Sequence, residues 1–318
     1  TCECKSSTLR MYYHIKYHQF FSEMNGHESN LVYALVYGCI LALGLPLNAV
    51  SLWILLRRHS LKSPSVVFMV NLAISDLLLV ISLPLRVYFY ATGTWSLSPE
   101  ACIWTTMLFR NNIRSSSIFI TFISVDRLLA VVYPLRSRHL RTAPNALKAV
   151  VFVWLFVVVL NIPERLRFSK FIKRKNNSTC FEFQHNVNIN DNSHGYKSAF
   201  TYLMSVLALT LLAVNVVCTM LVSWTLRRHL SDSARVNNKV NVMLIFFMNL
   251  VMFIICFLPM TVALLLFGLP VSTPLVCLAS FNCCLDPLLY YFSLDAFWKK
   301  KDDIELAREP GQGHTISM

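Results

Sequence analysis

The sequence predicts an all-α fold, a bundle of seven transmembrane helices followed by a short amphipathic eighth helix. Of the 318 residues, 55% are hydrophobic and only 14% are charged, which leaves too little polar surface to cover a soluble domain of this size. The hydrophobic residues also gather into stretches long enough to cross a bilayer as helix, which takes about 20 residues. These two observations favour one membrane-embedded bundle over two soluble domains.

Seven apolar stretches pass the length test for a membrane span. In chain order they are residues 31–56, 66–91, 101–127, 145–163, 198–226, 238–268 and 271–292. We therefore expect an extracellular tail (1–30), a seven-span transmembrane domain (31–292) and a cytoplasmic helix and tail (293–318). The cytoplasmic part begins with Leu294 to Lys301, which places aromatic and basic residues on two sides of a helix, as in helices that lie on a membrane surface.

Lysine and arginine set the predicted orientation. The net charge of +13 is distributed between the apolar blocks and not on one face, so it indicates membrane topology and no nucleic-acid partner. Basic residues follow the first, third and fifth spans, which places those loops in the cytoplasm: Arg57, Arg58, Lys62, Arg136, Arg138, Arg141, Arg227, Arg228, Arg235 and Lys239. The predicted location is the plasma membrane, multi-pass, with the N-terminus extracellular.

The loop after the fourth span is also basic, yet this topology places it outside. Longer loops cross the membrane despite their charge. The same loop contains the overlapping glycosylation acceptors Asn176 and Asn177, which are modified only in the secretory lumen. Both observations agree with an extracellular loop.

Two cysteines are placed for a disulfide bond on the outer side. Cys102 opens the third predicted span, and Cys180 lies in the long loop after the fourth, where an oxidising compartment preserves disulfides. We expect a Cys102–Cys180 bond, although sequence spacing also allows two free thiols.

Acidic residues inside the spans are candidates for a functional role, because burying a charge in lipid is costly. Asp126 and Arg127 adjoin at the cytoplasmic end of the third span, where they can hold each other in a closed state; a solvated helix end is the alternative. Asp76 and Asp286 lie at mid-bilayer depth. Either a cation bridges these two carboxylates or one of them is protonated.

Three arginines indicate an anion site near the outer surface. Arg86 lies near the outer end of the second span, while Arg110 and Arg114, four residues apart, share one face of the third. Guanidinium groups bind phosphate through paired hydrogen bonds, so these three are the candidate ligand-binding residues. The alternative is a structural role, with Glu164 or Glu182 neutralising one or two of them.

The surroundings of these arginines are predicted to be apolar. Residues 261–267 and 271–281, the outer halves of the last two spans, contain no lysine or arginine. A polyphosphate would require more positive charge. The predicted site therefore suits one small anionic head with a hydrocarbon tail, which favours a lysophospholipid over a nucleotide.

Several motifs together resemble the landmarks of rhodopsin-like G-protein-coupled receptors. In order they are Asn48, Asn71–Asp76, Asp126-Arg127-Leu128, Trp154, Cys256–Pro259 and Asp286–Tyr290. Within that class the chain resembles the purinergic-receptor-like group that includes the lysophosphatidic acid receptors. The stretches that show this likeness are Leu83–Arg86, Val125–Leu135, Cys180–Glu182, Asn215–Cys218 and Asn282–Pro287.

The resemblance implies a mechanism of activation. Ligand binding from outside contracts the bundle, the sixth helix swings outward about Pro259, and Arg127 leaves Asp126 to contact a heterotrimeric G protein. Tyr290 is the further residue assigned to activation. A proline kinks a helix because it lacks the amide hydrogen, so Pro259 is a reasonable hinge, with a static kink as the alternative.

The resemblance also implies an allosteric sodium ion that favours the inactive state. Asp76 and Asp286 would hold it, with Asn48 nearby. No other cofactor is expected.

The predicted function is that of a receptor, which binds an extracellular ligand of the lysophosphatidic acid type and activates heterotrimeric G proteins. Membrane lipids are the other expected partners. The alternatives are a receptor for a nucleotide or other small anion, and a non-signalling receptor, because the segment from Pro259 to Asp286 is shorter than the family normally has. A membrane transporter is an alternative from a different class of protein. It is disfavoured because the two halves of the sequence show no internal symmetry.

An enzyme is not expected. No nucleophile, base and orienting acid, and no set of metal ligands, occur in a pattern that would place them in one site. His14 and His18 at four-residue spacing form at most a weak metal pair in a polar tail.

Overall fold

The fold is a bundle of long helices, described by a computed structural model for residues 27–174, 180–181, 194–228, 236–266 and 272–291. Within those ranges there is no strand. The helical elements are α2 (His27–Arg58), α3 (Pro64–Thr92), α4 (Pro99–Val132), α5 (Ala143–Arg174), α6 (His194–Arg228), α7 (Val236–Met252), the π-helical segment η2 (Phe253–Phe257), α8 (Leu258–Leu266) and α9 (Thr273–Ser280).

Seven segments of the described chain are long and apolar enough to cross a membrane, which confirms the predicted all-α, seven-span architecture. They are Asn30–Arg57, Pro64–Thr92, Pro99–Val132, Ala143–Lys170, Ala199–Arg228, Met243–Leu265 and Thr273–Tyr291. The last two pass the test even though the sequence between Pro259 and Asp286 is short. The shortened segment therefore still contributes to two helices long enough to cross a membrane.

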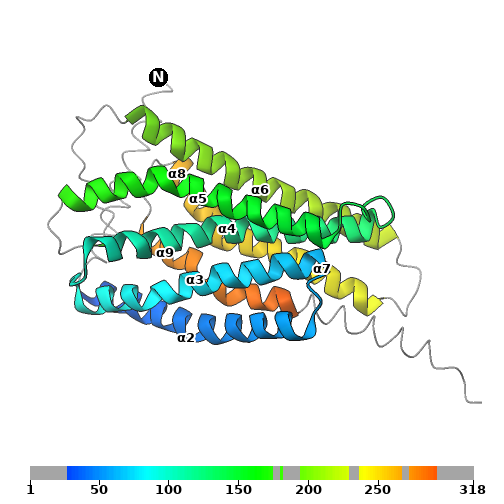
Figure 1. Cartoon of the computed structure of the whole chain (residues 1–318), viewed down its shortest axis with the longest axis horizontal. Helices are drawn as coiled ribbons and strands as arrows, with labels where there is room; N and C mark the ends of the chain where they lie inside the picture. Colours follow the sequence, from blue (N-terminus) through cyan, green and yellow to red (C-terminus); the bar gives the residue numbers. More distant parts are fainter. Residues whose placement is uncertain (1–26, 175–179, 182–193, 229–235, 267–271, 292–318) are drawn as a thin grey trace, which may run out of the picture.

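Helix α4 occupies the centre of the bundle. It packs against α3, α5 and α6 and also touches α7 and η2, whereas α2 lies against α3 at the edge. Figure 1 shows these helices side by side along the long axis of the molecule. Because α4 contacts most of the other spans, polar residues along it can reach several helices at once.

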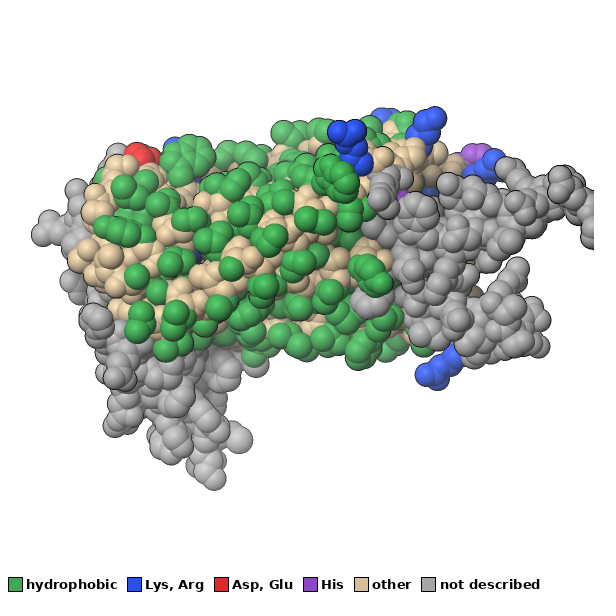
Figure 2. All heavy atoms as spheres, turned by 90° about the horizontal axis from the view of Figure 1, so that it is seen from below, with side chains coloured by type: hydrophobic (Ala, Val, Ile, Leu, Met, Phe, Trp, Pro, Cys, Tyr) green, Lys and Arg blue, Asp and Glu red, His purple; other side chains and the backbone are tan. Residues whose placement is uncertain are grey.

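The outward-facing surface of the bundle is apolar in its middle. Side chains such as Leu43, Trp53, Ile81, Val158 and Leu203 are exposed on the outside of the helices. Figure 2 shows that hydrophobic side chains fill the middle of one face, while most of its lysine and arginine side chains lie toward one end. Such an apolar surface matches hydrocarbon as solvent.

The fourth helix is longer than the sequence indicated. The predicted span ends at residue 163, where the apolar run gives way to Glu164 and a basic run, but α5 continues through Pro163 to Arg174. A helix need not end where its apolar stretch ends, and in a membrane protein neighbouring groups satisfy the carbonyl that a proline frees. The extra turns place Glu164 inside the helix and within the bundle.

The sixth span changes from α-helix to π-helix and back in its middle. Helix α7 passes into five residues of π-helix, η2, before α8 begins, and the Leu258 amide donates to the carbonyl oxygen of Phe253. Pro259 follows at once and has no amide hydrogen to donate, so it leaves an earlier carbonyl without its usual partner. A wide turn before a proline is a common site of bending. The π-helical turn thus lies directly before Pro259, whereas a kink or hinge at Pro259 remains a prediction.

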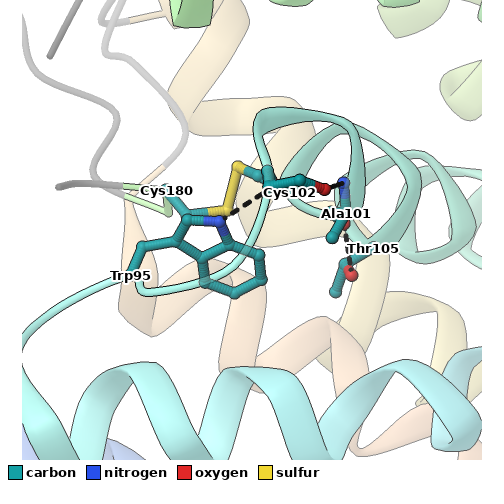
Figure 3. Close-up of a disulfide and its surroundings, with 6 residues drawn as sticks. Trp95, Ala101, Cys102, Thr105 and Cys180 are labelled. Atoms are coloured by element: carbon teal, nitrogen blue, oxygen red, sulfur yellow. Dashed lines mark hydrogen bonds between the residues drawn. A yellow bond between two sulfur atoms is a disulfide. The ribbon is translucent and has the colours of Figure 1, made fainter. Parts of the chain in front are cut away.

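A disulfide bond closes one end of the bundle, as predicted. Cys102 at the start of α4 is bonded to Cys180, with 5.7 Å between their Cα atoms. Figure 3 shows the indole of Trp95 beside this bond, and its nitrogen donates to the carbonyl oxygen of Ser98 at 3.2 Å. The bond holds the next residue, Phe181, fully inside the bundle. We call this the disulfide end of the molecule.

Two predicted features fall outside the described residues. They are the amphipathic eighth helix and the glycosylation acceptors Asn176 and Asn177.

Candidate functional site

A cavity of about 290 Å³ opens among six of the seven spans. It lies between α3, α4, α5, α6, the sixth span and α9, toward the disulfide end. All three predicted ligand arginines, Arg86, Arg110 and Arg114, line it together with Glu164. The other lining residues are uncharged and mainly apolar, among them Met204, Leu207, Ala208, Leu211, Phe253, Phe257, Met260, Leu264 and Val276.

Arg86 is buried in the wall of this cavity with 1% of its surface exposed. Its guanidinium carbon lies 4.6 Å from the ring centre of Phe109 and 4.3 Å from that of Phe181, with Tyr37 at 5.8 Å. Within the described ranges it forms no ion pair with a carboxylate, and its Nε is buried without a hydrogen-bond partner. The aromatic faces offset part of the free-energy cost of burying the charge, but they do not accept hydrogen bonds of normal strength.

Sequence reasoning missed the aromatic residues around Arg86. Phe109 sits one residue before Arg110 on α4, and Phe181 enters only because the disulfide draws the loop inward. Phe181 in turn packs against Phe89 and Trp95, with ring centres 5.3 and 5.5 Å apart. The adjacency of Cys180 and Phe181 was the one signal in the sequence that could have pointed to this contact.

Arg110 and Arg114 converge on one acid, as their spacing on a helix face allows. Arg110 Nη1 lies 3.0 Å and Arg114 Nη2 2.7 Å from the same oxygen, Oε2 of Glu164. The alternative that Glu164 neutralises the arginines is therefore partly correct: one carboxylate is shared by two cations. Glu182, the other acid considered, lies outside the described residues.

Neutral amides extend this contact between α4 and α5. Arg114 Nη1 also donates to Asn161 Oδ1, and Asn161 Nδ2 donates to Asn111 Oδ1 at 3.2 Å. Residues 111 and 114 on α4 thus face residues 161 and 164 on α5, each pair three residues apart and on one side of its helix. We call these residues, with Arg110, the Glu164 clasp.

Asp76 and Asp286 meet in the middle of the bundle. Both are fully buried, and their carboxyl groups lie within hydrogen-bonding reach of each other. Asn112 Nδ2 donates to Asp76 at 2.9 Å, and Asn282 Nδ2 donates to Asp286 at 2.7 Å. Two adjacent carboxylates require either a shared proton or a cation, as the sequence suggested.

Asn48 lies close to these acids and is tied to the backbone. Its Nδ2 donates to the carbonyl oxygen of Cys283 at 2.6 Å and to that of Gly44 at 3.0 Å. The contact requires α2 to approach the last span closely: a Cβ on Gly44 would lie 3.1 Å from the Cys283 sulfur. Several buried oxygens here accept no hydrogen bond from the described residues, namely Oδ1 of Asn48, Asn112, Asn282 and Asp286 and Oδ2 of Asp76. Such an oxygen-rich set suits a hard cation.

At the other end of α4, Asp126 has partners that the sequence did not reveal. It accepts a hydrogen bond from Ser65 on α3 and forms an ion pair with Arg141, with 2.8 Å between Oδ1 and Nε. Arg141 had been assigned only to the basic cytoplasmic loop. Arg127 is the next residue on α4, and the acid of the predicted Asp126–Arg127 pair is held by Arg141.

A polar network joins three helices next to the Asp126–Arg127 segment of α4. Ser124 on α4 donates to Asn215 on α6 at 2.7 Å and accepts from Asn249 on α7 at 2.8 Å. Asn215 also donates to Thr121 at 2.8 Å. All four side chains are buried. The predicted activation residue Tyr290 lies in the hydrophobic core of the bundle and is 1% exposed.

Comparison with known proteins agrees with this architecture. The family described as 7 transmembrane receptor (rhodopsin family) matches residues 47–290. Lysophosphatidic acid receptor 4 of Homo sapiens is 34% identical over 282 residues, which cover 83% of this chain and 75% of that protein. Lysophosphatidic acid receptor 6 of Gallus gallus is 33% identical over 288 residues, covering 83% of this chain and 90% of the relative.

Lysophosphatidic acid receptor 5 of Bos taurus is 35% identical over 315 residues, covering 92% of this chain and 82% of the relative. These relatives are receptors and not enzymes or transporters. The family match covers most of the chain and includes the spans that form the cavity, the acid pair and the Asp126 contacts. The chain therefore belongs to the rhodopsin family of seven-transmembrane, G-protein-coupled receptors.

Proposed function

We propose that this receptor binds a lysophosphatidic-acid-type lipid and activates heterotrimeric G proteins. The observation on which the proposal depends is Arg86, a buried guanidinium in the cavity wall that no described carboxylate neutralises. A buried charge without an opposite charge is costly, and an anionic ligand would supply the missing partner.

The charge of the cavity matches one phosphate monoester. Three arginines and one glutamate line it, so its formal charge is +2. A phosphate monoester bears about −1.5 to −2 at neutral pH. A phosphocholine head would bring an additional cation to a site that already has a positive charge.

The rest of the cavity favours a hydrocarbon tail. Apart from the four charged residues, its lining is mainly the apolar side chains of α6, the sixth span and α9. A nucleotide would leave its ribose and base polar groups facing these residues, whereas an acyl chain would not. The names of the three relatives support the same ligand class.

We further infer that the disulfide end faces the outside of the cell. Disulfides persist in oxidising compartments, and the basic loops lie at the opposite end, as expected for the cytoplasmic side. The N-terminus is then extracellular and the protein resides in the plasma membrane.

Replacing Arg86 should remove the response to the lipid. In Arg86→Ala the phosphate loses a charge-assisted contact, and we expect the potency of oleoyl lysophosphatidic acid in a G-protein activation assay to fall about 10- to 100-fold. Arg86→Lys retains the charge but not the planar, stacked guanidinium, so the potency of the lipid on this variant should be intermediate. ATP and UDP should be inactive on the wild-type receptor.

Arg165→Ala is the matched control. Arg165 also stacks on an aromatic ring, 4.6 Å from the centre of Trp104, but does not line the cavity. Its potency should equal that of the wild type at equal surface expression. Unchanged potency in Arg86→Ala would contradict the proposal, and a well-expressed wild type that is silent to the lipid would favour a non-signalling receptor or another ligand.

A sodium ion between Asp76 and Asp286 is proposed as an allosteric ligand. Asn48 and Asn112 offer further oxygens, and the ion would supply the positive charge that two adjacent carboxylates lack. By favouring the inactive packing, it should lower agonist affinity.

The test compares agonist binding in sodium chloride and in choline chloride. Sodium should weaken agonist binding to the wild type, whereas Asp76→Asn, which lacks one carboxylate, should bind equally in both salts. Sodium sensitivity that persists in Asp76→Asn would exclude this site.

We propose that activation separates the cytoplasmic half of the sixth span from α4, with Pro259 as the hinge and Arg127 and Tyr290 released to new partners. The Ser124–Asn249 hydrogen bond must then break, because it joins α4 to α7. Asn249→Leu removes this bond from the inactive state, which should raise ligand-independent signalling by up to about tenfold.

Phe247→Leu is the control for this substitution, since Phe247 lies on the same helix and is 59% exposed on the lipid-facing surface. Its basal activity should match the wild type. If Asn249→Leu reaches the surface normally and its basal signalling stays at the wild-type level, the proposed role of this bond is wrong.

A further inference from the structure

Glu164 is the one acid among the described residues that line the ligand cavity. It comes from α5 and is held by two arginines of α4 through a single oxygen, at 3.0 and 2.7 Å. Its side chain is 15% exposed, so it is buried in the wall yet borders the cavity. An acid in an anion site repels the ligand unless it serves another purpose.

We propose that Glu164 determines the charge of the ligand, limiting the cavity to a lipid with one phosphate group and excluding lipids with two. This inference rests on the proposed function and adds to it the class of head group. Without Glu164 the three arginines would give a formal charge of +3, which suits the additional negative charge of a diphosphate. With Glu164 present the charge is +2.

The geometry adds a second effect to the net charge. Because Arg110 and Arg114 both point a guanidinium nitrogen at Glu164, those donors are occupied. A second phosphate of the same ligand would compete with the carboxylate for both arginines and would be repelled by it at close range. Arg86 has no such competitor among the described residues and is left for the first phosphate.

A purely structural role for the Glu164 clasp predicts something different. If the clasp only fixes α4 against α5, breaking it should lower the affinity for every anionic lipid in proportion. The ratio of affinities for two head groups on the same tail would then stay constant. This ratio separates the two roles.

The probes are hexadecyl monophosphate and hexadecyl diphosphate, which share one tail and differ by one phosphate group. Their affinities would be measured by competition with a fluorescent lysophosphatidic acid on the full-length receptor in lipid nanodiscs. Wild type should prefer the monophosphate. Glu164→Gln, neutral and of similar shape, should shift the ratio toward the diphosphate by at least about tenfold.

Thr201→Lys is the second variant, which keeps the clasp intact. Thr201 lines the cavity from α6, so a lysine there adds the same positive charge without removing Glu164. It should shift the ratio in the same direction, and it provides the test if Glu164→Gln fails to fold. Asn161→Ala is the control: it removes a neutral hydrogen bond of the clasp, and the ratio should remain that of the wild type.

An unchanged ratio in Glu164→Gln, or in Thr201→Lys if Glu164→Gln fails to fold, with wild-type monophosphate binding intact, would overturn this inference and leave the proposed function standing. Wild-type receptor that binds neither lipid would instead overturn the proposed function.

Discussion

The burial of Arg86 is the constraint on which the disulfide end of the molecule depends. A guanidinium inside a membrane bundle is stable only with groups that compensate for lost water. Here two phenyl rings face it, and one of them, Phe181, is held there by the Cys102–Cys180 bond. The disulfide thus does more than close a loop, because it holds an aromatic ring against the buried arginine that lines the cavity. Arg110 and Arg114 are compensated differently, by a shared carboxylate, and this difference separates a charge available to a ligand from charges that mainly join two helices.

The same requirement, that buried polar groups need compensating partners, applies at two other places in the bundle. At mid-depth the carboxyl groups of Asp76 and Asp286 meet among amides whose oxygens accept no described hydrogen bond, which is an arrangement short of positive charge. Near the opposite end, Ser124, Asn215 and Asn249 satisfy one another across three helices. In lipid, each such polar contact has few competitors, so breaking one requires a new partner elsewhere. Under the proposed function, ligand, sodium ion and G protein would bias the bundle because each would supply a partner to one of these sites in one packing only.

Much of this arrangement could be predicted from the sequence, for physical reasons. Bilayer thickness fixes the length of apolar stretches, so all seven spans were found, and helical geometry placed Arg110 and Arg114 on one face. Contacts between segments distant in the sequence were harder. Phe181 reaches Arg86 only through the disulfide, and Arg141 reaches Asp126 only through the fold of a loop. The end of α5 was misplaced because hydropathy falls at Pro163, although the helix continues to Arg174.

The central claim is that a phosphate monoester neutralises the charge of Arg86, which no carboxylate of the described residues pairs. An experimental structure of the receptor with oleoyl lysophosphatidic acid tests it most directly. The account predicts the phosphate within hydrogen-bonding distance of the Arg86 guanidinium, beside Phe109 and Phe181, with the acyl chain among the apolar residues of α6 and the sixth span. A phosphate bound elsewhere, with Arg86 still enclosed by aromatic rings and making no contact to the lipid, would contradict it.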